Sequence, residues 1–542
     1  LFRSKPDFAA AHNNLGNVLR DLGKLEDAVA SYHKALAINP DFAVAHNNLG
    51  ISLLDLGKSE DAVASYRKAL AIYPEYAEAH CNLGTALLKQ GHVDEAVTQM
   101  DLALSYKPEK NGWHIRKALF LPIIPSSQQD IHTRRDALTK AVTSLRNQNL
   151  IVPDLVSDVG LANFYLAYHN QNNSRLLQDI ASMHITACPK LTYKAKHCQP
   201  EQRSEKDVLR IGFLSAYLRN HTVGQHFRGL IEQFSREKFE VVVFNTHANQ
   251  DQTSTIINQT ADKVVYLQKN LERDRGIIEK EKLDILLYLD IGMDPYTYFL
   301  SFSRLAPVQA VTIGHAETSG VPSIDYFLSS EVSELPRADD HYSERLIKLS
   351  VLPTFYYQPE LPVKPYTRSE FDLPEEVRLY VYAHSLFKLH PGFDKTLGKL
   401  LRRDPDGRLI IVDDQADGHW TKLILERFHR SFPDVAGHVI SIPRLPTEKF
   451  IGLLTIADAL LDNPFISGLS VGLMALGVTA PIVAWPGELC SARCVTACYK
   501  QMGLSDLIAT DEESYLTLAL RLAQDTDFKR RMQADINVNL HK

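Results

Sequence analysis

Residues 457–488, ADALLDNPFISGLSVGLMALGVTAPIVAWPGE, are the stretch that decides the fold. An apolar run ends at Asp462, a turn of small residues follows, and residues 469–477 have helical composition before a second apolar run at 481–485. This pattern predicts a strand, a turn, a helix and another strand. The first backbone N–H groups of such a helix attract phosphate. An ordinary crossover with nothing bound has the same pattern, so both interpretations stay open.

Strand-like runs alternate with helical stretches through the rest of the chain beyond residue 206. The runs predict strands at 208–214, 239–244, 283–289, 310–313 and 326–329, and then at 378–382, 409–412 and 438–441. Such alternation predicts two parallel, doubly wound sheets. We therefore expect an N-terminal Rossmann-like domain at 207–365 and a C-terminal one at 366–542, with a cleft between them.

Two such domains without other nucleotide-binding fingerprints favour one class of enzyme. The chain has neither a GxGxxG motif nor a Walker lysine, so dinucleotide-dependent and P-loop enzymes gain no support. Paired Rossmann-like domains of this kind suggest a GT-B type glycosyltransferase, in which helix dipoles and basic side chains neutralise the donor diphosphate. We therefore expect a nucleotide-sugar substrate, held mainly by the C-terminal domain, and neither a metal ion nor another cofactor.

The N-terminal part of the chain is a 34-residue repeat. Pro6, Pro40, Pro74 and Pro108 are 34 residues apart, and each repeat carries Leu-Gly early and Ala-Val in its middle. This is the tetratricopeptide pattern, whose helix pairs stack into a superhelix. We expect an α-superhelix at 1–108, joined to the α/β half by a helical linker region at 109–206. Within that region, residues 163–168 and 176–183 resemble packed helices, and the polar residues 199–206 a linker.

Asn14, Asn48 and Asn82 recur in the first helix of each repeat. Amides repeated along a concave wall could hydrogen-bond the backbone of an extended peptide, whatever its sequence. An asparagine that packs one repeat against the next would recur in the same way. Because tetratricopeptide arrays generally bind proteins, we favour capture of an acceptor protein or peptide by this wall.

Composition and charge narrow the possible partners. The 542 residues carry a formal net charge of −6, which gives nucleic-acid binding no electrostatic support. No apolar run approaches the roughly 18 residues that a membrane-spanning helix needs. We expect a cytoplasmic protein with further repeats before Leu1. Cys490, Cys494 and Cys498 fall on one face of a predicted helix, and we favour packing in the core over a metal site.

Short motifs in a fixed order carry a family resemblance. They are 211–215 (IGFLS) with Asn220 and His221, 306–309 (APVQ), 314–320 (GHAETSG), 325–326 (DY), 342–346 (YSERL), 385–388 (SLFK), 486–488 (PGE) and 502–504 (MGL). Behind tetratricopeptide repeats, this series resembles the O-GlcNAc transferase family, including its bacterial members with such repeats. The resemblance covers nearly the whole chain.

The resemblance implies two catalytic positions. Lys388 matches the family lysine that contacts the donor diphosphate, where a cation offsets the charge that develops on the leaving group; an isolated lysine would otherwise be a solvated surface charge. His221 matches a histidine at the mouth of the cleft, which could orient the acceptor hydroxyl or pass its proton. A loop histidine that caps the following helix is the alternative. The sequence assigns no catalytic base.

The resemblance also implies a set of donor-binding residues. Gly314 and His315 match positions that line the sugar pocket, where glycine lets the ring approach the backbone. Ser385 lies beside the expected diphosphate, at a place where relatives often have glutamine. Phe450 falls near the expected site of the base and could pack on it, although better-known members carry histidine there.

The diphosphate loop departs from the family pattern. Relatives are usually rich in Gly, Asn and Thr at this place or have His-Thr-Thr, whereas this chain has Gly468, Leu469, Ser470 and Val471. Ser470 alone keeps a hydroxyl near the expected position, so the backbone N–H groups would have to bind the phosphates.

These observations predict an inverting protein O-glycosyltransferase. The preferred reaction moves N-acetylglucosamine from UDP-N-acetylglucosamine to Ser or Thr of a protein. Two alternatives stay open. One is a transferase with another nucleotide-sugar, such as a hexose donor or GDP-fucose, and the other is a tetratricopeptide scaffold whose degenerate transferase half does no chemistry.

Overall fold

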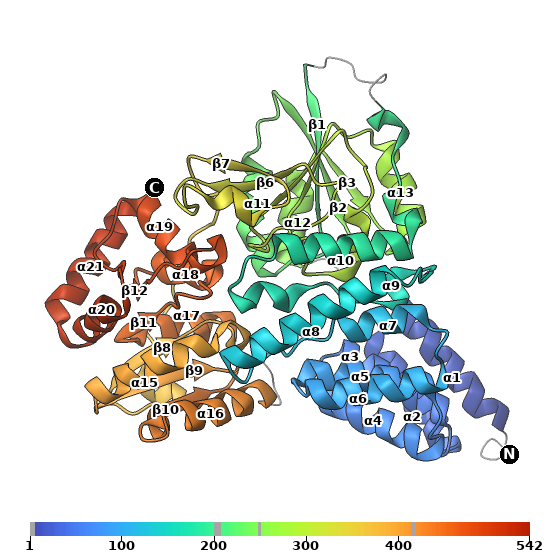
Figure 1. Ribbon diagram of the computed structural model, residues 1–542. Coiled ribbons are helices and arrows are strands. Elements are labelled where there is room, and N and C mark those ends of the chain that lie inside the picture. Colours follow the sequence, from blue (N-terminus) through green and yellow to red (C-terminus); the bar gives the residue numbers. More distant parts are fainter. Residues whose placement is uncertain (1–5, 200–206, 248–250, 414–417) are drawn as a thin grey trace. The chain divides into compact units, whose positions relative to one another are not determined.

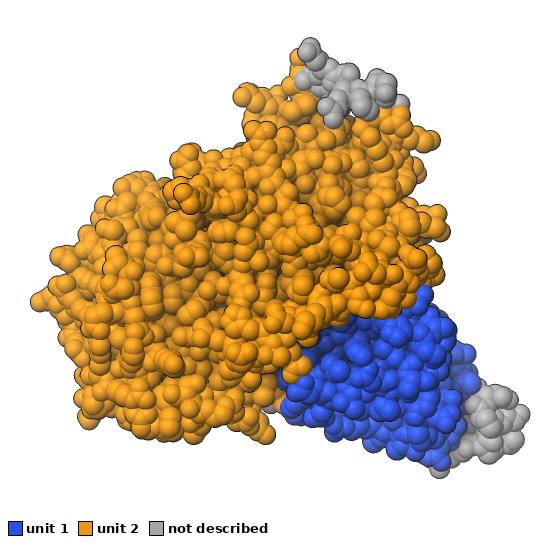
Figure 2. Space-filling model, in the orientation of Figure 1, with its two compact units in different colours: residues 1–124 blue, residues 125–542 orange. Residues whose placement is uncertain are grey.

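The chain forms two compact units, residues 1–124 and 125–542 (Figure 1, Figure 2). The computed structural model describes residues 6–199, 207–247, 251–413 and 418–542. The linker expected at 199–206 lies outside these residues, apart from Gln199. The first unit is helical, and the second contains both sheets.

The described part of the first unit consists of three helix pairs, as the 34-residue pattern predicts, followed by one further helix, α7, beyond the predicted repeats. They are α1 (Pro6–Asp21), α2 (Leu25–Ile38), α3 (Ala43–Asp55), α4 (Ser59–Ile72), α5 (Ala77–Gln90), α6 (Val93–Tyr106) and α7 (Asn111–Ala118). In the first two pairs, the repeated glycine of the first helix lies against a tyrosine of the second helix. A Cβ on Gly50 would lie 2.6 Å from Cε1 of Tyr66, whose side chain is fully buried, so the contact requires glycine.

Helices also open the second unit. They are α8 (Gln128–Arg146), α9 (Leu155–Asp158), the 3₁₀ helix η1 (Phe164–His169) and α10 (Ser174–Ala187). The helix predicted at 176–183 is confirmed as part of α10. The stretch at 163–168 forms the short 3₁₀ helix η1 instead of a longer packed helix, and it ends at Asn170, which has a left-handed backbone conformation.

The first sheet has seven parallel strands in the order β3-β2-β1-β4-β5-β6-β7. They are β1 (Leu209–Ser215), β2 (Phe239–Asn245), β3 (Lys263–Tyr266), β4 (Ile285–Tyr288), β5 (Val308–Thr312), β6 (Tyr326–Ser330) and β7 (Arg345–Leu349), with helices α11 (Thr222–Gln233), α12 (Gln252–Thr260), α13 (Leu271–Lys280) and α14 (Pro295–Ser301). The five predicted strands are confirmed. The sequence analysis missed β3 and β7, the two edge strands, because both are short and carry charged residues.

The second sheet repeats this topology with five parallel strands in the order β10-β9-β8-β11-β12. They are β8 (Arg378–Tyr382), β9 (Gly407–Val412), β10 (Val439–Ile442), β11 (Ala459–Leu461) and β12 (Ile482–Val483), with η7 (Leu386–Lys388), α15 (Asp394–Arg403), α16 (His419–Ser431), α17 (Thr447–Ile456), α18 (Leu469–Gly477), α19 (Cys494–Met502), α20 (Glu512–Gln524) and α21 (Thr526–Asn539). The opening stretch is therefore β11, a turn, α18 and β12, as predicted. Helical repeats followed along the chain by two doubly wound sheets confirm the expected fold class.

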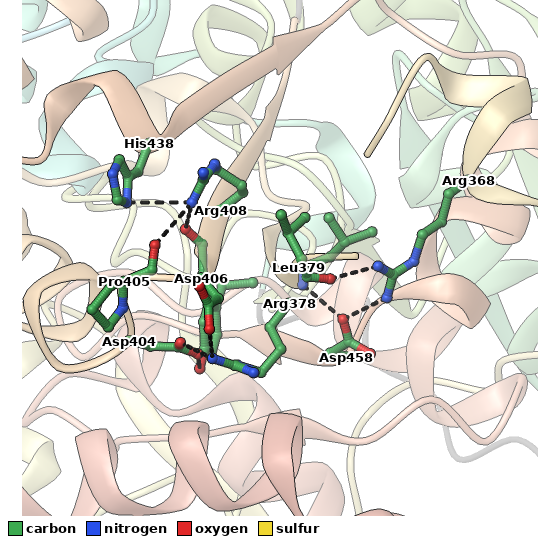
Figure 3. Close-up of polar contacts among 12 residues, drawn as sticks. Arg368, Arg378, Leu379, Asp404, Pro405, Asp406, Arg408, His438 and Asp458 are labelled. Atoms are coloured by element: carbon green, nitrogen blue, oxygen red, sulfur yellow. Dashed lines mark hydrogen bonds and ion pairs between the residues drawn. The ribbon is translucent and has the colours of Figure 1, made fainter. Parts of the chain in front are cut away.

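Ion pairs join residues at the amino ends of the strands in the second sheet (Figure 3). Nε of Arg378, at the start of β8, donates to Oδ2 of Asp404 at 2.6 Å. Asp458 precedes β11, and its Oδ2 accepts from Nη2 of Arg368 and from the Leu379 N–H, both at 2.7 Å. These contacts fix the amino ends of neighbouring strands. The opposite, carboxyl ends are where ligands bind in doubly wound sheets.

Candidate functional site

A cavity of about 650 Å³ lies in the second unit, lined by residues that follow strands of both sheets. Its wall also includes the starts of α11 and α18 and residues of η1. Nine of the ten residues predicted for catalysis and donor binding line it, namely His221, Gly314, His315, Ser385, Lys388, Phe450, Leu469, Ser470 and Val471. The tenth, Gly468, is buried at the N-cap of α18. The structure thus brings the predicted set together around one space.

The first turn of α18 faces this cavity without a side-chain cap. Its N-cap residue, Gly468, has no side chain, and the N–H groups of a first helical turn have no carbonyl partner inside the helix. Leu469, Ser470 and Val471 all line the cavity. The orphan N–H groups and the helix dipole together suit an anion such as phosphate.

Lys388 is tied to the loop before α18 through the side chain of Asn463. Nδ2 of Asn463 donates to the carbonyl oxygen of Lys388 at 2.8 Å. Its Oδ1 accepts from the N–H groups of Phe465 and Ile466, each at 2.9 Å. Asn463 is fully buried, whereas Lys388 is half-buried in the cavity wall. One amide therefore sets the position of the lysine relative to the start of α18, and the sequence analysis did not find it.

Three histidines in the cavity wall, His221, His226 and His315, carry no positive charge at pH 7. Burial, with the nearby Arg219 charge, lowers the pKa of His221 to about 4. Burial and the charge of Lys388 lower the pKa of His226 to about 3 and that of His315 to about 4. All three rings are therefore neutral at pH 7. Lys388 and the exposed Arg444 also line the cavity and are the basic side chains of its wall besides the histidines.

His221 caps α11, which is the alternative considered for it in the sequence analysis. Its Nδ1 accepts from the Val223 N–H at 3.2 Å, and its ring stacks on Tyr217 with the centroids 4.3 Å apart. Because a backbone N–H can only donate, Nδ1 is unprotonated and the neutral ring carries its proton on Nε2. In this state His221 can donate a hydrogen bond from Nε2. It has no unprotonated nitrogen left to take a proton from an acceptor hydroxyl.

Gly314 and His315 follow β5 at the wall of the cavity. A Cβ on Gly314 would lie 1.8 Å from the carbonyl oxygen of Leu289, so main-chain packing already requires glycine here, whatever the cavity holds. His315 is buried and stacks on Phe164 of η1, with the centroids 5.2 Å apart.

Aromatic residues of η1 form a part of the wall that the sequence analysis missed. Phe164, Tyr165 and Tyr168 line the cavity together with Phe387 of η7. Tyr168 and Phe387 have their ring centroids 4.8 Å apart, and Phe164 and Phe387 5.7 Å. The signal was the concentration of aromatic residues at 164–168, which we assigned to helix packing. Aromatic faces of this kind suit the apolar side of a sugar ring or an acceptor side chain.

Ser385 and Phe450 reach the cavity from other elements of the second sheet. Ser385 is the N-cap residue of η7, and its carbonyl oxygen accepts from the Lys388 N–H at 2.9 Å. Phe450 lies in α17 and is half-buried. Asp413, at the end of β9, lines the same cavity. A base that packs on Phe450 would thus lie in a cavity that also has a carboxylate in its wall.

The repeated asparagines belong to the first unit and line no part of this cavity. Nδ2 of Asn48 donates to Oδ1 of Asn13 at 3.0 Å, and Nδ2 of Asn82 donates to Oδ1 of Asn47 at 2.9 Å. Asn14 is exposed. These amides join one repeat to the next, which is the packing role considered above. Capture of a peptide stays a prediction.

The three C-terminal cysteines do not share one helix face, so that prediction is wrong. Cys490 lies in a separate 3₁₀ helix, Cys490–Ala492, whereas α19 starts at Cys494. Cys490 and Cys498 are buried, and Cys494 lines the cavity. Across the described residues, no group of three or more His, Cys, Asp or Glu side chains could hold a metal ion. Over the same residues, no helix has both the length and the apolar character to cross a membrane.

Comparison with known proteins gives matches over both units. The model of glycosyl transferase family 41 matches residues 168–360 and 357–542, and two tetratricopeptide repeat models match residues 16–57, 52–91 and 77–110. A Thermobaculum terrenum O-GlcNAc transferase mutant has a similar structure, with a TM-score of 0.74 and 20% identity over 99% of this chain and 93% of that one. At that identity the likeness supports the fold.

Two curated relatives represent different activities. One is a probable UDP-N-acetylglucosamine–peptide N-acetylglucosaminyltransferase of Arabidopsis thaliana, 25% identical over 60% of this chain. The other is a UDP-glucose:protein N-beta-glucosyltransferase of Actinobacillus pleuropneumoniae, 26% identical over 48% of this chain. The chain spans 34% and 41% of the length of these relatives. Because the family model matches well over half of its residues, the chain belongs to glycosyl transferase family 41.

Proposed function

We propose that this chain is a glycosyltransferase that moves a sugar from a nucleoside-diphosphate donor to protein side chains. The observation that carries the proposal is the cavity in which Lys388 and the uncapped start of α18 meet, fixed to each other by Asn463. A cation and a helix N-terminus on one side of a cavity suit a diphosphate leaving group.

The reaction breaks the bond between the sugar C1 and the diphosphate oxygen, forms a bond between C1 and the acceptor atom, and releases the nucleoside diphosphate and the acceptor's proton. Lys388 and the first turn of α18 offset the negative charge that grows on the diphosphate. His221 donates from Nε2 and orients the donor or the acceptor. Its hydrogen-bonded tautomer argues against a role as general base, which would have to accept the proton of the acceptor.

The preferred reaction transfers N-acetylglucosamine from UDP-N-acetylglucosamine to Ser or Thr, with inversion and without a metal ion. The name of the Arabidopsis thaliana relative supports this sugar. The tetratricopeptide unit would hold the protein acceptor. Transfer of glucose to an asparagine amide is a second candidate, favoured by the similarity to the N-beta-glucosyltransferase.

A donor and acceptor panel tests these proposals. The full chain is incubated with UDP-N-acetylglucosamine, UDP-glucose or GDP-fucose and with peptides that differ only in Ser, Thr or Asn, and products are weighed by mass spectrometry. Removal of a charge-stabilising group typically costs about 10²–10³ in turnover, which is the loss expected for Lys388→Ala. Lys395→Ala, an exposed lysine of α15, is the control. No transfer from any donor, together with no binding of UDP or GDP, would favour the scaffold alternative.

A further inference from the structure

His384 follows β8 and lies against the loop before α18. Its side chain is 1% exposed, and its Nε2 lies 3.1 Å from Oδ1 of Asp462, which follows β11 and is equally buried. Oδ2 of Asp462 accepts from Oγ of Ser467 at 2.6 Å, and Oδ1 from the Gly468 N–H at 3.4 Å. One buried carboxylate therefore holds the loop by hydrogen bonds and lies within ion-pair distance of the imidazole ring. The strands β8 and β11 that carry the pair are neighbours in the sheet.

The other ring nitrogen of His384 faces the N-cap of α18. A Cβ on Gly468 would lie 2.1 Å from Nδ1 of His384, so any other residue there would collide with the ring. Both ring nitrogens are buried, and neither makes a hydrogen bond of regular geometry to any described residue, although Nε2 lies close to Asp462. A buried polar atom without a partner destabilises a fold, so its retention calls for a reason. His384 also lines the cavity.

Asp462 places a buried negative charge beneath the site proposed for the diphosphate. With a neutral His384 the pair carries one negative charge, which repels a second anion in a medium of low dielectric. A proton on His384 makes the pair neutral. Two side chains at the start of α18, Leu469 and Val471, carry no polar group that could stabilise a bound diphosphate.

We infer that His384, held by Asp462, is a further donor-binding residue that takes up a proton when the diphosphate of the donor binds at the start of α18. This inference rests on the proposed function. The approach of an anion favours the charged form of a nearby imidazole, which ordinarily titrates near pH 6.5. The protonated ring then compensates for the polar side chains that positions 469 and 471 lack.

Several other titratable groups lie around the pair of His384 and Asp462. The groups that face it are Lys388 and Cys494 in the cavity wall and Tyr382, Cys498, Tyr499 and Tyr515 in the core. Burial raises the pKa of Cys494 to about 12, and it also raises the pKa values of Cys498, Tyr499 and Tyr515. These four groups already hold their protons at pH 7.5 and cannot take up another. The histidines in the wall, His221, His226 and His315, are the competing acceptors, so a variant must separate them from His384.

Calorimetric titration of the full chain with UDP and with GDP tests the inference. At pH 7.5, the binding enthalpy in buffers of different ionisation enthalpy gives the number of protons taken up. We expect a substantial fraction of one proton for the wild type and for His184→Asn, a buried histidine of α10 outside the cavity. We expect almost none for His384→Asn and His384→Gln. The wild-type affinity should rise as the pH falls from 8 to 7, by up to about tenfold, and much less in the variants.

The outcomes separate the two proposals. If the wild type bound a nucleotide without taking up a proton, the inference would be overturned, even if both variants failed to fold. It would also be overturned if His384→Asn took up as many protons as the wild type. In both cases the proposed function would stand. Failure of the wild type to bind either nucleotide would overturn both.

Discussion

Replacing Asn463 should break the link between Lys388 and the start of α18. The amide makes four hydrogen bonds inside the protein: Nδ2 donates to Lys388 O at 2.8 Å and to Tyr382 Oη at 2.9 Å, and Oδ1 accepts from Phe465 N and Ile466 N. Asn463→Ala removes all four and leaves their partners in a buried place. Asn463→Asp keeps the two contacts made by Oδ1 but turns an oxygen toward the carbonyl of Lys388.

The size of the effect follows from this count. A hydrogen bond contributes roughly 0.5–1.5 kcal/mol net, so the loss of four predicts a fall of about 2–6 kcal/mol in the free energy of unfolding for Asn463→Ala. Domains are typically stable by roughly 5–15 kcal/mol, so this is a large share. Asn463→Asp should also weaken UDP or GDP binding, because Lys388 loses its fixed position.

Denaturant unfolding of both variants measures the first effect, and calorimetric titration measures the second. Asn172→Ala is the matched control, since this exposed asparagine makes only two hydrogen bonds among the described residues: its Nδ2 donates to Asp340 O and its Oδ1 accepts from Ser174 N, each at 2.9 Å. We expect the control to lose less than about 1 kcal/mol. A loss for Asn463→Ala no larger than that of the control would refute the reasoning, as would unchanged nucleotide affinity in a folded Asn463→Asp.

Three further changes test other parts of the structure. Gly468→Ala places a Cβ 2.1 Å from Nδ1 of His384 and should weaken nucleotide binding about tenfold or more in titration calorimetry; unchanged affinity would contradict the close contact. Burial raises the pKa of Asp290 to about 7, whereas an aspartate in the unfolded chain has a pKa of about 3.9. Between these two pH values, the folded protein therefore holds a proton on Asp290 that the unfolded chain has lost. The wild type should therefore lose stability relative to Asp290→Asn as the pH rises from 4 to 7, by about 4 kcal/mol at most, whereas parallel unfolding profiles would argue against a protonated Asp290. Asp458→Ala removes an ion pair and the acceptor of the Leu379 N–H, and should cost about 2 kcal/mol in denaturant unfolding; a loss below about 0.5 kcal/mol would show that the amino end of the sheet does not depend on it.

The sequence predicts the sheets because buried parallel strands are continuous apolar runs. Such runs identified β1, β2, β4, β5 and β6 in the first sheet and all five strands of the second. The edge strands β3 and β7 have one partner each, and charged residues (Lys263 in β3, Arg345 and Lys348 in β7) leave them only two or three consecutive apolar or aromatic residues, so no long run marks them. The 3₁₀ helix η1 was assigned to helical packing because periodicity in a short segment cannot show which residues turn toward a cavity.

The residues of the candidate site fall into two groups, those that sequence motifs predict and those that only the folded sheet brings together. Motifs led to the residues that line the cavity, such as Lys388 and Ser470. They did not lead to Asn463 or to the pair of His384 and Asp462, because these residues act through contacts between β8 and β11. The two strands are distant in sequence and adjacent only in the folded sheet. The sequence order of strands does not reveal that adjacency.

The aromatic residues of η1 and all the other residues of the cavity wall lie in the same compact unit, which allows the repeats to change independently. Every residue that lines the cavity, from Phe164 of η1 to Cys494 of α19, belongs to the second unit. The repeats of the first unit can therefore gain or lose copies, or exchange their surface residues, without altering the walls where the chemistry would take place. Repeat arrays tolerate such changes because each repeat contacts only its neighbours. Sequence changes can thus accumulate in one unit while selection preserves the residues that line the cavity in the other.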